Sequence, residues 1–218
     1  MASEQVENYL KNIYQLQEKG GKVSTSSLSA RLHISAPSVT EMIKKLADGG
    51  ILTYTPYKGV ELTSEGKKRA LRVVRRHRLW ELFLLKVLHY PWHEIHEEAD
   101  RLEHITSDKL EQRLDEALGF PRKDPHGDAI PTVEGDIERL RHIPLSDVKP
   151  GTTVTVARVS DSVPQILEYA STLGIELNKR IKVKERIAFD GSMRVQLGRD
   201  EKFVSLKLAE NIVVEEKP

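Results

Sequence analysis

Apolar and polar positions in the first third of the chain follow a helical period three times and then a strand period. Apolar residues recur every three or four positions in three segments, which Gly20-Gly21, the HISAP turn and Gly49-Gly50 delimit. The runs ILTYTP and GVELT alternate around Tyr57-Lys58-Gly59, which indicates a β-hairpin. The predicted elements are helices over residues 4–18, 26–32 and 37–48 and a hairpin over residues 51–63. This order is that of a winged helix-turn-helix, whose third helix enters the major groove of DNA.

The middle third is predicted to be helical. Residues 64–88 form one long helix whose second half, LWELFLLKVL, is apolar nearly all round, as in helices that contact both a core and a partner subunit. Two further helices, over residues 92–104 and 107–118, follow the break at Pro91. The stretch RKDPHGDAIP is rich in Pro, Gly and Asp and is predicted to be a loop.

The last third changes to a strand period after Pro150-Gly151. The runs TVTVARV, RIKVKERI, MRVQLG and FVSLKL alternate or are β-branched, and one helical segment, PQILEYASTLG, interrupts them. This pattern predicts a small β-barrel behind a linker over residues 140–151. The chain is therefore expected to be an α+β protein of three domains: a winged helix-turn-helix over residues 1–72, a helical domain over residues 73–145 and a β-barrel over residues 150–218.

Charge is distributed unevenly over these segments. Residues 1–78 carry 14 Lys/Arg and 7 Asp/Glu, a net charge of +7, whereas residues 79–149 carry 9 and 16, a net charge of −7. Residues 150–218 carry 11 and 10 and are nearly neutral. A basic block suits a polyanion such as DNA, and an acidic block that contains most of the histidines suits a cation.

The exposed face of the predicted third helix carries residue types that hydrogen-bond or pair with phosphates. These residues are Ser38, Thr40, Glu41, Lys44 and Lys45, and Lys58 lies at the tip of the hairpin. Such side chains contact phosphates and base edges in DNA-bound proteins. The alternatives are an ordinary solvated helix face and a winged helix that binds protein, and the charge of residues 1–78 favours DNA.

Histidines and carboxylates in the middle third have the spacing of a metal site. Those on the helix over residues 92–104 fall at offsets of 0, 4, 7 and 8, on one helix face, and are His96, Asp100, Glu103 and His104. His77 and Glu81 are four residues apart on the preceding helix, so two facing helices could assemble a shell of nitrogen and oxygen ligands. Such ligands suit Mn²⁺, Fe²⁺ or Zn²⁺. The alternative is a solvated acidic helix whose histidines are incidental.

The same segments, in the same order, resemble the diphtheria toxin repressor family of iron- and manganese-dependent repressors. The resemblance rests on NYLKNIYQL, SAPSVTEMIKKL, LTSEGKKRALRVVRRHRLWELFL and HEEADRLEHITSDKLEQRL, and it extends over nearly the whole chain. The ordered set is specific, although each segment alone is a weak signal. The resemblance implies that the helical domain binds metal and mediates dimerisation and that the C-terminal barrel is SH3-like.

The resemblance also implies functional residues. The family's regulatory metal site takes one residue from the first helix and three from the metal-site helix, which correspond to Asn8, Asp100, Glu103 and His104. The second site corresponds to His77, Glu81 and His96, with Asp124 and His126 in DPHG and Asp161 and Gln165 in the barrel as further candidates. The positions that the family uses at bases and phosphates correspond to Ser35, Pro37, Ser38, Thr40 and Glu41.

Two positions bear on the identity of the metal. Iron-type members of the family have Cys where this chain has Asp100, and manganese-type members have a carboxylate there, so the resemblance favours Mn²⁺ over Fe²⁺. Asn8 stands where iron-type members have Met and manganese-type members have Asp. An amide oxygen can coordinate a metal without adding charge. The alternative is that Asn8 is a polar first-turn residue that binds no metal.

The resulting prediction is a cytoplasmic transcriptional repressor, not an enzyme, that controls metal-homeostasis genes. It is expected to bind a palindromic operator in double-stranded DNA as a homodimer when Mn²⁺ or Fe²⁺ fills two sites per subunit. No membrane contact is expected, because no apolar run approaches the roughly 18 residues that cross a bilayer and the first ten residues lack the features of a secretory signal. No small-molecule substrate is expected either. The absence of cysteine excludes disulfides and thiolate zinc sites. The alternatives are a metal-independent winged-helix DNA-binding dimer and a metallohydrolase.

Overall fold

The computed structural model describes residues 3–18, 20, 23–55, 58–138, 142–160 and 163–215. Its helices are α1 (Glu4–Glu18), α2 (Thr25–Leu32), α3 (Ala36–Asp48), α4 (Ser64–Lys86), α5 (Ile95–Glu103), α6 (Asp108–Ala117), α7 (Pro164–Thr172) and α8 (Leu206–Glu210), with a 3-10 helix over Leu145–Asp147. Its strands are β1 (Leu52–Thr55), β2 (Gly59–Leu62), β3 (Ile143–Pro144), β4 (Thr153–Val159), β5 (Arg180–Arg186), β6 (Met193–Leu197), β7 (Asp200–Val204) and β8 (Ile212–Glu215).

The chain divides into two compact units. The first consists of Met1–His77, Arg101–Arg113 and Ile130–Ile137, and the second of Arg78–Asp100, Leu114–Ala129 and Glu138–Pro218. Both α4 and α5 therefore contribute residues to each unit. No helix in the described part of the chain combines the length and the apolar character that a membrane span requires.

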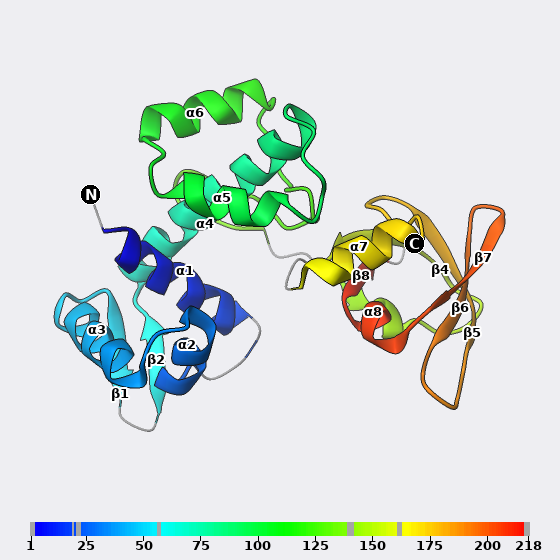
Figure 1. The fold of residues 1–218 in the computed structure, drawn as a ribbon, viewed down its shortest axis with the longest axis horizontal. Helices are drawn as coiled ribbons and strands as arrows, with labels where there is room; N and C mark the ends of the chain where they lie inside the picture. Colours follow the sequence, from blue (N-terminus) through cyan, green and yellow to red (C-terminus); the bar gives the residue numbers. More distant parts are fainter. Residues whose placement is uncertain are drawn as a thin grey trace. The chain divides into compact units, whose positions relative to one another are not determined.

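The N-terminal part of the first unit is a winged helix-turn-helix, as the sequence predicts (Figure 1). Buried residues of α1, α2 and α3 share one core with the antiparallel hairpin β1–β2, in which Leu52 pairs with Leu62. Local sequence sets the helix starts. Ser24 caps α2 in a reciprocal capping box with Ser27, and Pro37 occupies the first turn of α3, where its missing N–H costs nothing.

Buried charges join α4 to α6 within the first unit. Arg75, which is 5% exposed, donates from Nε to Glu111 Oε1 at 2.9 Å and from Nη1 to the carbonyl oxygen of Pro131 at 2.8 Å. Arg76 Nε donates to Glu111 Oε2 at 2.9 Å. A carboxylate that accepts from two guanidinium groups is well compensated for its burial. These bonds fix α6 against the part of α4 that immediately precedes His77.

The strands of the second unit form a six-stranded antiparallel sheet in the order β3-β8-β4-β5-β6-β7. Figure 1 labels β4 to β8 of this sheet. The residues that face inward are the apolar members of the alternating runs, for example Val154, Val156 and Val195. Helices α7 and α8 contribute Ile166 and Leu208 to the same core. The predicted C-terminal β-barrel is thus confirmed.

Two stretches of the barrel differ from the prediction made from the sequence. The run FVSLKL is strand only as far as Val204, because Ser205 then caps α8 by accepting the N–H of Leu208 at 3.3 Å. The predicted linker over residues 140–151 was wrong in part, since it supplies β3 and the fully buried Leu145 to the barrel. The strand β8, which pairs with both β3 and β4, was missed. A two-residue strand such as β3 carries no detectable period of its own.

Candidate metal sites and DNA-binding surface

The first candidate metal site, site 1, lies in the first unit and is formed by Glu7, Asn8, Glu103 and His104. His104, which follows α5, places its two ring nitrogens against α1: Nδ1 lies 2.7 Å from Glu7 Oε2, and Nε2 lies 3.2 Å from Asn8 Oδ1. The same Nε2 lies 3.3 Å from Glu103 Oε1. The structure therefore brings together three of the four residues that the sequence predicts for the regulatory site, and it adds Glu7.

Glu103 is the most buried carboxylate of site 1, with no exposed surface. Its Oε2 accepts a hydrogen bond from Lys11 Nζ at 2.7 Å and lies 2.6 Å from His77 Nδ1. Its Oε1 has no hydrogen-bond partner among the described residues. A buried carboxylate oxygen without a donor is costly, and a cation beside it removes that cost. The donor set of site 1, an imidazole with carboxylate and amide oxygens, therefore fits a divalent metal of the Mn²⁺ or Fe²⁺ type.

The charge state of His104 reflects its acidic neighbours. Burial lowers the pKa of this imidazole, but the hydrogen bond with Glu7 and the negative charges of Glu103 and Glu7 outweigh burial, so the pKa of His104 is raised above its usual value. A raised pKa means that the folded protein holds a proton on His104 more tightly than a free imidazole does. A metal that binds His104 has to displace that proton.

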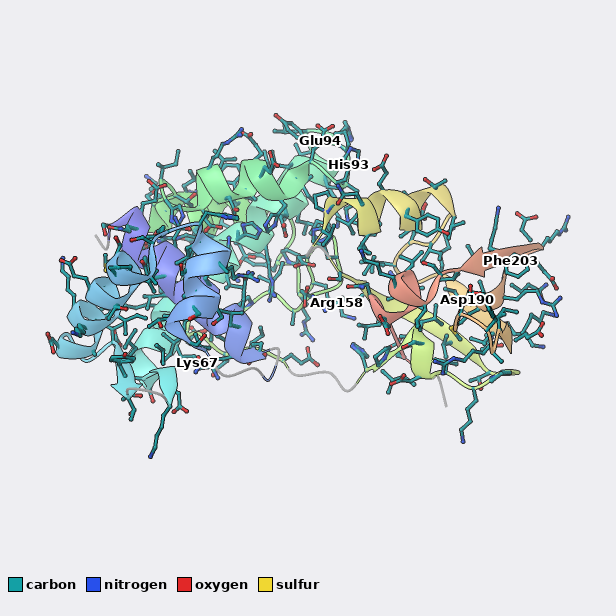
Figure 2. The ribbon with its side chains drawn as sticks, turned by 60° about the horizontal axis from the view of Figure 1, so that its bottom comes forward. Lys67, His93, Glu94, Arg158, Asp190 and Phe203 are labelled. Carbon is teal, nitrogen blue, oxygen red and sulfur yellow. The ribbon has the colours of Figure 1, made fainter. Side chains whose placement is uncertain are left out.

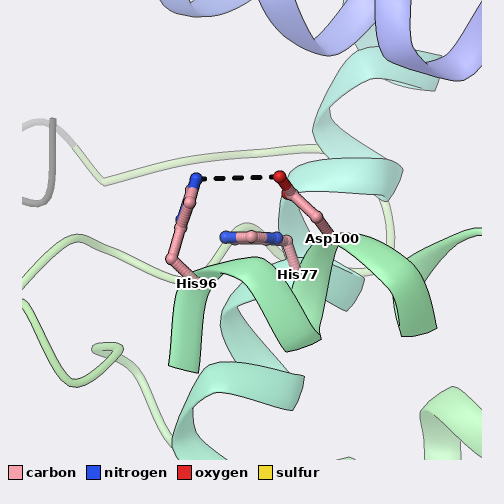
Figure 3. A group of neighbouring side chains, drawn as sticks. All are labelled: His77, His96 and Asp100. Atoms are coloured by element: carbon pink, nitrogen blue, oxygen red, sulfur yellow. Dashed lines mark ion pairs between the residues drawn. The ribbon is translucent and has the colours of Figure 1, made fainter. Parts of the chain in front are cut away.

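Two residues that the sequence assigns to metal sites each contact a residue assigned to the other predicted site. Asp100, expected in the regulatory site, is exposed, and its Oδ2 lies 3.8 Å from His96 Nε2 in the second unit (Figure 3). His77, expected in the second site, is buried in the first unit, where Nδ1 lies 2.6 Å from Glu103 Oε2 and 3.0 Å from Lys11 Nζ. Both residues thus take part in an imidazole–carboxylate contact.

The second candidate site, site 2, lies in the second unit and consists of Glu81, His96 and His126. Glu81 Oε1 is 3.2 Å from His96 Nδ1 and 3.5 Å from His126 Nε2. Glu81 and His126 are almost completely buried, at 1% and 0% exposed, whereas His96 is half-buried. The ring of His126 stacks on Trp92 with a centroid distance of 5.7 Å and an interplanar angle of 14°. One carboxylate and two imidazoles thus converge from α4, α5 and the loop that contains DPHG.

The DPHG turn holds His126 in place by backbone contacts. The carbonyl oxygen of His126 accepts the N–H of Val159 on β4 at 3.0 Å. Gly127 has a φ of +94°, and a Cβ at this position would lie 2.0 Å from the carbonyl oxygen of Ala157, so only glycine allows this approach. Asp128 accepts a hydrogen bond from Arg158 of β4 at 2.7 Å, and Figure 2 shows Arg158. The loop that carries His126 is therefore anchored to the barrel.

Asp124 supports this turn. Its Oδ1 accepts the backbone N–H groups of His126 and Asp128 at 2.8 and 2.9 Å, and its Oδ2 lies 3.2 Å from Arg78 Nε. Burial raises the pKa of Asp124 to about 7, with the charge of Asp128 acting in the same direction and Arg78 opposing it. Both carboxylate oxygens have protein partners, so the geometry indicates that Asp124 orients the turn around His126.

Two further ligands were predicted from the sequence, and three residues that the structure places at the sites were not. Asp161 lies outside the described residues, and Gln165 is exposed on α7. Glu7, Lys11 and Trp92 were not predicted from the sequence. Glu7 and Lys11 have a detectable signal, because they lie next to Asn8 and one turn after it on the same helix. Trp92 has none, since its stacking on His126 depends on the tertiary fold.

The predicted DNA-contacting residues gather on the N-terminal half of α3 and on the hairpin. Ser35 caps α3, and its Oγ lies 2.8 Å from Ser38 Oγ. Thr40 is half-buried and donates from Oγ1 to the carbonyl oxygen of Ala36 at 2.8 Å. The remaining predicted contacts are exposed, namely Pro37, Glu41, Lys44 and Lys58, as is Lys45. Tyr57, in the predicted hairpin turn, lies outside the described residues. This surface can present hydroxyl groups and ammonium groups to a nucleic acid.

Three family models match successive parts of the chain. Residues 1–60 match the model described as iron dependent repressor, N-terminal DNA binding domain. Residues 63–132 match iron dependent repressor, metal binding and dimerisation domain, and residues 143–216 match the FeoA domain. The matched segments coincide with the winged helix, with the helices that carry most of the candidate ligands, and with the barrel.

Individual proteins with similar sequences and structures agree with these matches. The iron-dependent repressor IdeR of Mycobacterium leprae is 31% identical over 191 residues, which cover 82% of this chain and 83% of that protein. The diphtheria toxin repressor of Corynebacterium glutamicum is 36% identical over 125 residues, 57% of this chain and 55% of that protein. A solved structure described as a manganese-dependent transcriptional repressor in complex with manganese is 41% identical, with a TM-score of 0.92 over 97% of this chain and 100% of its own. The structure of the manganese regulator SloR is 34% identical, with a TM-score of 0.78 over 97% and 98%.

Proposed function

The chain belongs to the iron-dependent repressor family, and we propose that it is a Mn²⁺-activated member that represses transcription by binding a palindromic operator as a homodimer. The observation that carries the proposal is the meeting of Asn8 of α1 with Glu103 and His104 at the end of α5. Asn8 lies about a hundred positions before Glu103 and His104 in the sequence, and all three side chains offer hard or borderline ligand atoms. A divalent metal between them ties the helix that begins the DNA-binding region to the metal-binding region.

The ligand types favour Mn²⁺ as the effector. Site 1 offers oxygen from Glu103 and Asn8 and one imidazole, and helical spacing adds Asp100, four residues before His104. The chain contains no cysteine, so no soft thiolate is available to select zinc or iron. The likeness at 41% identity to a manganese-dependent repressor supports the same choice.

Site 2 is proposed as a second metal site with a structural role. Glu81, His96 and His126 supply the ligands, and the sequence adds Asp161 from the barrel. Asp124 acts as a positioning residue, because it fixes the backbone on both sides of Gly127. The anchored turn makes this site part of the folded core of the second unit.

When bound, Mn²⁺ supplies two positive charges that neutralise the carboxylates and hold the ligands at fixed positions. The chain's own residues transmit the effect. Asn8 lies on α1, whose Leu10 and Ile13 are fully buried in the core that also contains Ile43 of α3. A constraint on the position of α1 therefore also acts on α3, because the two helices share this core. Metal and DNA each favour the same arrangement, so each raises the affinity for the other by the same factor.

On the DNA side, α3 is proposed to lie in the major groove. Ser35, Ser38 and Thr40 present hydroxyl groups at its N-terminal end, and Glu41 can accept from the amino group of cytosine. Lys44 and Lys58 pair with phosphates, so binding should weaken steeply as salt rises. A twofold dimer presents two such helices and matches a palindromic operator. This arrangement assigns regulation rather than catalysis to the metal.

The test measures DNA binding as a function of metal. Double-stranded DNA is selected from a random pool by the Mn²⁺-loaded protein, labelled, and titrated by fluorescence anisotropy in Mn²⁺, Fe²⁺ without oxygen, Zn²⁺ or EDTA. We expect tight binding in Mn²⁺, a loss of about a hundredfold or more in EDTA, and no metal response in His104→Ala. His93→Ala is the matched control, because His93 is an exposed imidazole beside Glu94 (Figure 2) and should leave the response unchanged.

Three results would contradict the proposal. Equal DNA binding in Mn²⁺ and EDTA indicates a metal-independent DNA-binding dimer. An unchanged metal response in His104→Ala excludes site 1 as the regulatory site. Stronger activation by Fe²⁺ than by Mn²⁺ at equal free concentrations overturns the choice of effector.

A further inference from the structure

Site 1 already contains a cation that belongs to the protein. Lys11 projects from α1, one helical turn after Asn8, and is only 4% exposed. Its Nζ donates to Glu103 Oε2 at 2.7 Å and lies 3.0 Å from His77 Nδ1. An ammonium group this deeply buried is stable only when a negative charge and hydrogen-bond acceptors compensate it. Glu103, which is completely buried, supplies that charge.

Glu103 consequently faces two cation positions, one at each oxygen. Oε2 is directed at Lys11 and His77, and Oε1 lies 3.3 Å from His104 Nε2 without a hydrogen-bond partner among the described residues. Asn8 Oδ1 lies 3.2 Å from the same His104 nitrogen. The inner position is thus filled by the side chain of Lys11, and the outer position has ligand atoms from Asn8, Glu103 and His104.

We propose that Lys11 is a resident counter-cation that shares the charge of Glu103 with the metal and thereby raises the metal concentration at which site 1 fills. This inference rests on the proposed function of site 1. In the metal-free protein Lys11 compensates Glu103, so the site remains folded before metal arrives. In the metal-bound protein the ammonium would repel the divalent ion, since both would interact with one carboxylate. Lys11 sets the affinity of site 1 for the metal and is not a ligand.

The physical consequence is an opposite effect of Lys11 on two measurable properties. Removing its charge should destabilise the metal-free protein, because Glu103 loses its main counter-ion. The same change should strengthen metal binding, because the repulsion disappears and more of the Glu103 charge is available to the metal. A side chain with a merely structural role would weaken both properties together. His77 Nδ1, 2.6 Å from Glu103 Oε2, keeps one polar neighbour at this oxygen when Lys11 is replaced.

The test compares full-length wild type with Lys11→Met, which keeps the length and removes the charge, and Lys11→Arg, which keeps the charge. The Kd for Mn²⁺ is measured by competition with a fluorescent chelator, and the midpoint of thermal unfolding is measured in EDTA. In Lys11→Met we expect a Kd lower by about tenfold or more together with a lower midpoint in EDTA. In Lys11→Arg we expect a Kd close to that of wild type.

Control variants separate this inference from the proposed function. His104→Ala is introduced into wild type and into Lys11→Met, and it should abolish the high-affinity component in both. If His104→Ala leaves the wild-type Kd unchanged, the proposed function of site 1 fails. If wild type depends on His104 but Lys11→Met binds Mn²⁺ equally or more weakly, the counter-cation role is overturned. Lys11→Gln, which retains a hydrogen-bond donor, replaces Lys11→Met if that variant does not fold, and the same two outcomes apply.

Discussion

Site 1 joins side chains from α1 and from the end of α5, whereas site 2 takes its residues from α4, α5 and a loop whose backbone is fastened to the barrel. In site 1 the contacts are between side chains, and the central carboxylate, Glu103, is compensated by the ammonium of Lys11. In site 2 the key imidazole, His126, is fully buried, stacks on Trp92 and is held by the hydrogen bond from Val159.

This difference separates two uses of similar ligands. The contacts of site 1 given above join side chains of α1, of His77 on α4 and of the end of α5, and none of them involves a backbone hydrogen bond. Metal binding there can bias the position of α1, which is the requirement for linkage to DNA binding. Site 2 is preorganised by the backbone around Gly127, so metal binding there mainly adds stability to the second unit. We therefore propose the regulatory role for site 1 and the structural role for site 2.

The largest expected effect tests the backbone anchor of site 2. Gly127→Ala places a Cβ 2.0 Å from the carbonyl oxygen of Ala157 at a φ of +94°, so the turn has to move away from β4. We expect the free energy of unfolding to fall by about 4 kcal/mol and the stoichiometry of bound Mn²⁺ to fall by one ion per subunit. Urea unfolding and equilibrium dialysis measure the two effects.

Gly151→Ala is the matched control in the same unit. Gly151 has a φ of +90°, but a Cβ there meets no atom within 4 Å. The free energy of unfolding of this variant should fall only by the cost of a left-handed backbone conformation at a non-glycine residue, about 1–2 kcal/mol. The variant should keep both metal ions. Equal losses in the two variants would mean that the approach of Gly127 to β4 does not hold site 2 together.

The next effect contrasts the two buried carboxylates in the absence of metal. Glu103→Gln removes the carboxylate that pairs with the buried ammonium of Lys11. The free energy of unfolding should therefore fall by about 3 kcal/mol. Glu81→Gln should cost about 1 kcal/mol, because its neighbours His96 and His126 are imidazoles that can be neutral. Chemical unfolding of both variants in EDTA provides the comparison. If Glu81→Gln lowers the free energy of unfolding as much as Glu103→Gln does, the two sites do not differ in how their buried carboxylates are compensated.

The sequence predicted the elements of both units well because most are long enough to show a period. The helix over residues 4–18 and the start of α4 at Ser64 were predicted to the residue. Errors arose where tertiary contacts decide: the short strand β3 exists because β8 lies beside it, and LKL of FVSLKL is helical because Ser205 caps it.

For the sites, the spacing and the resemblance identified the candidate residues but not which side chains contact each other. Asp100, Glu103 and His104 share a helical face in the sequence, yet Glu103 turns toward Lys11 and His77 while Asp100 approaches His96. Lys11 was not predicted to belong to site 1: a lysine is usually solvated, and its burial at 4% exposed is a property of the fold. Charge compensation between α1 and α5 could not be derived from either segment alone.

The smallest expected effect concerns the amide in site 1. Asn8→Asp replaces a neutral oxygen ligand with a carboxylate 3.2 Å from His104 Nε2, so the Kd for Mn²⁺ should fall by about tenfold. Asn12→Asp adds the same charge one turn later on α1 and serves as the control, with an expected change of less than about threefold. Competition with a fluorescent chelator measures both. A decrease in Kd for Asn8→Asp alone identifies Asn8 as a ligand. Equal decreases in Kd for the two variants would mean that the added charge acts at long range and that Asn8 is not a ligand. His104 and Glu103 would then be the residues that distinguish site 1 from site 2.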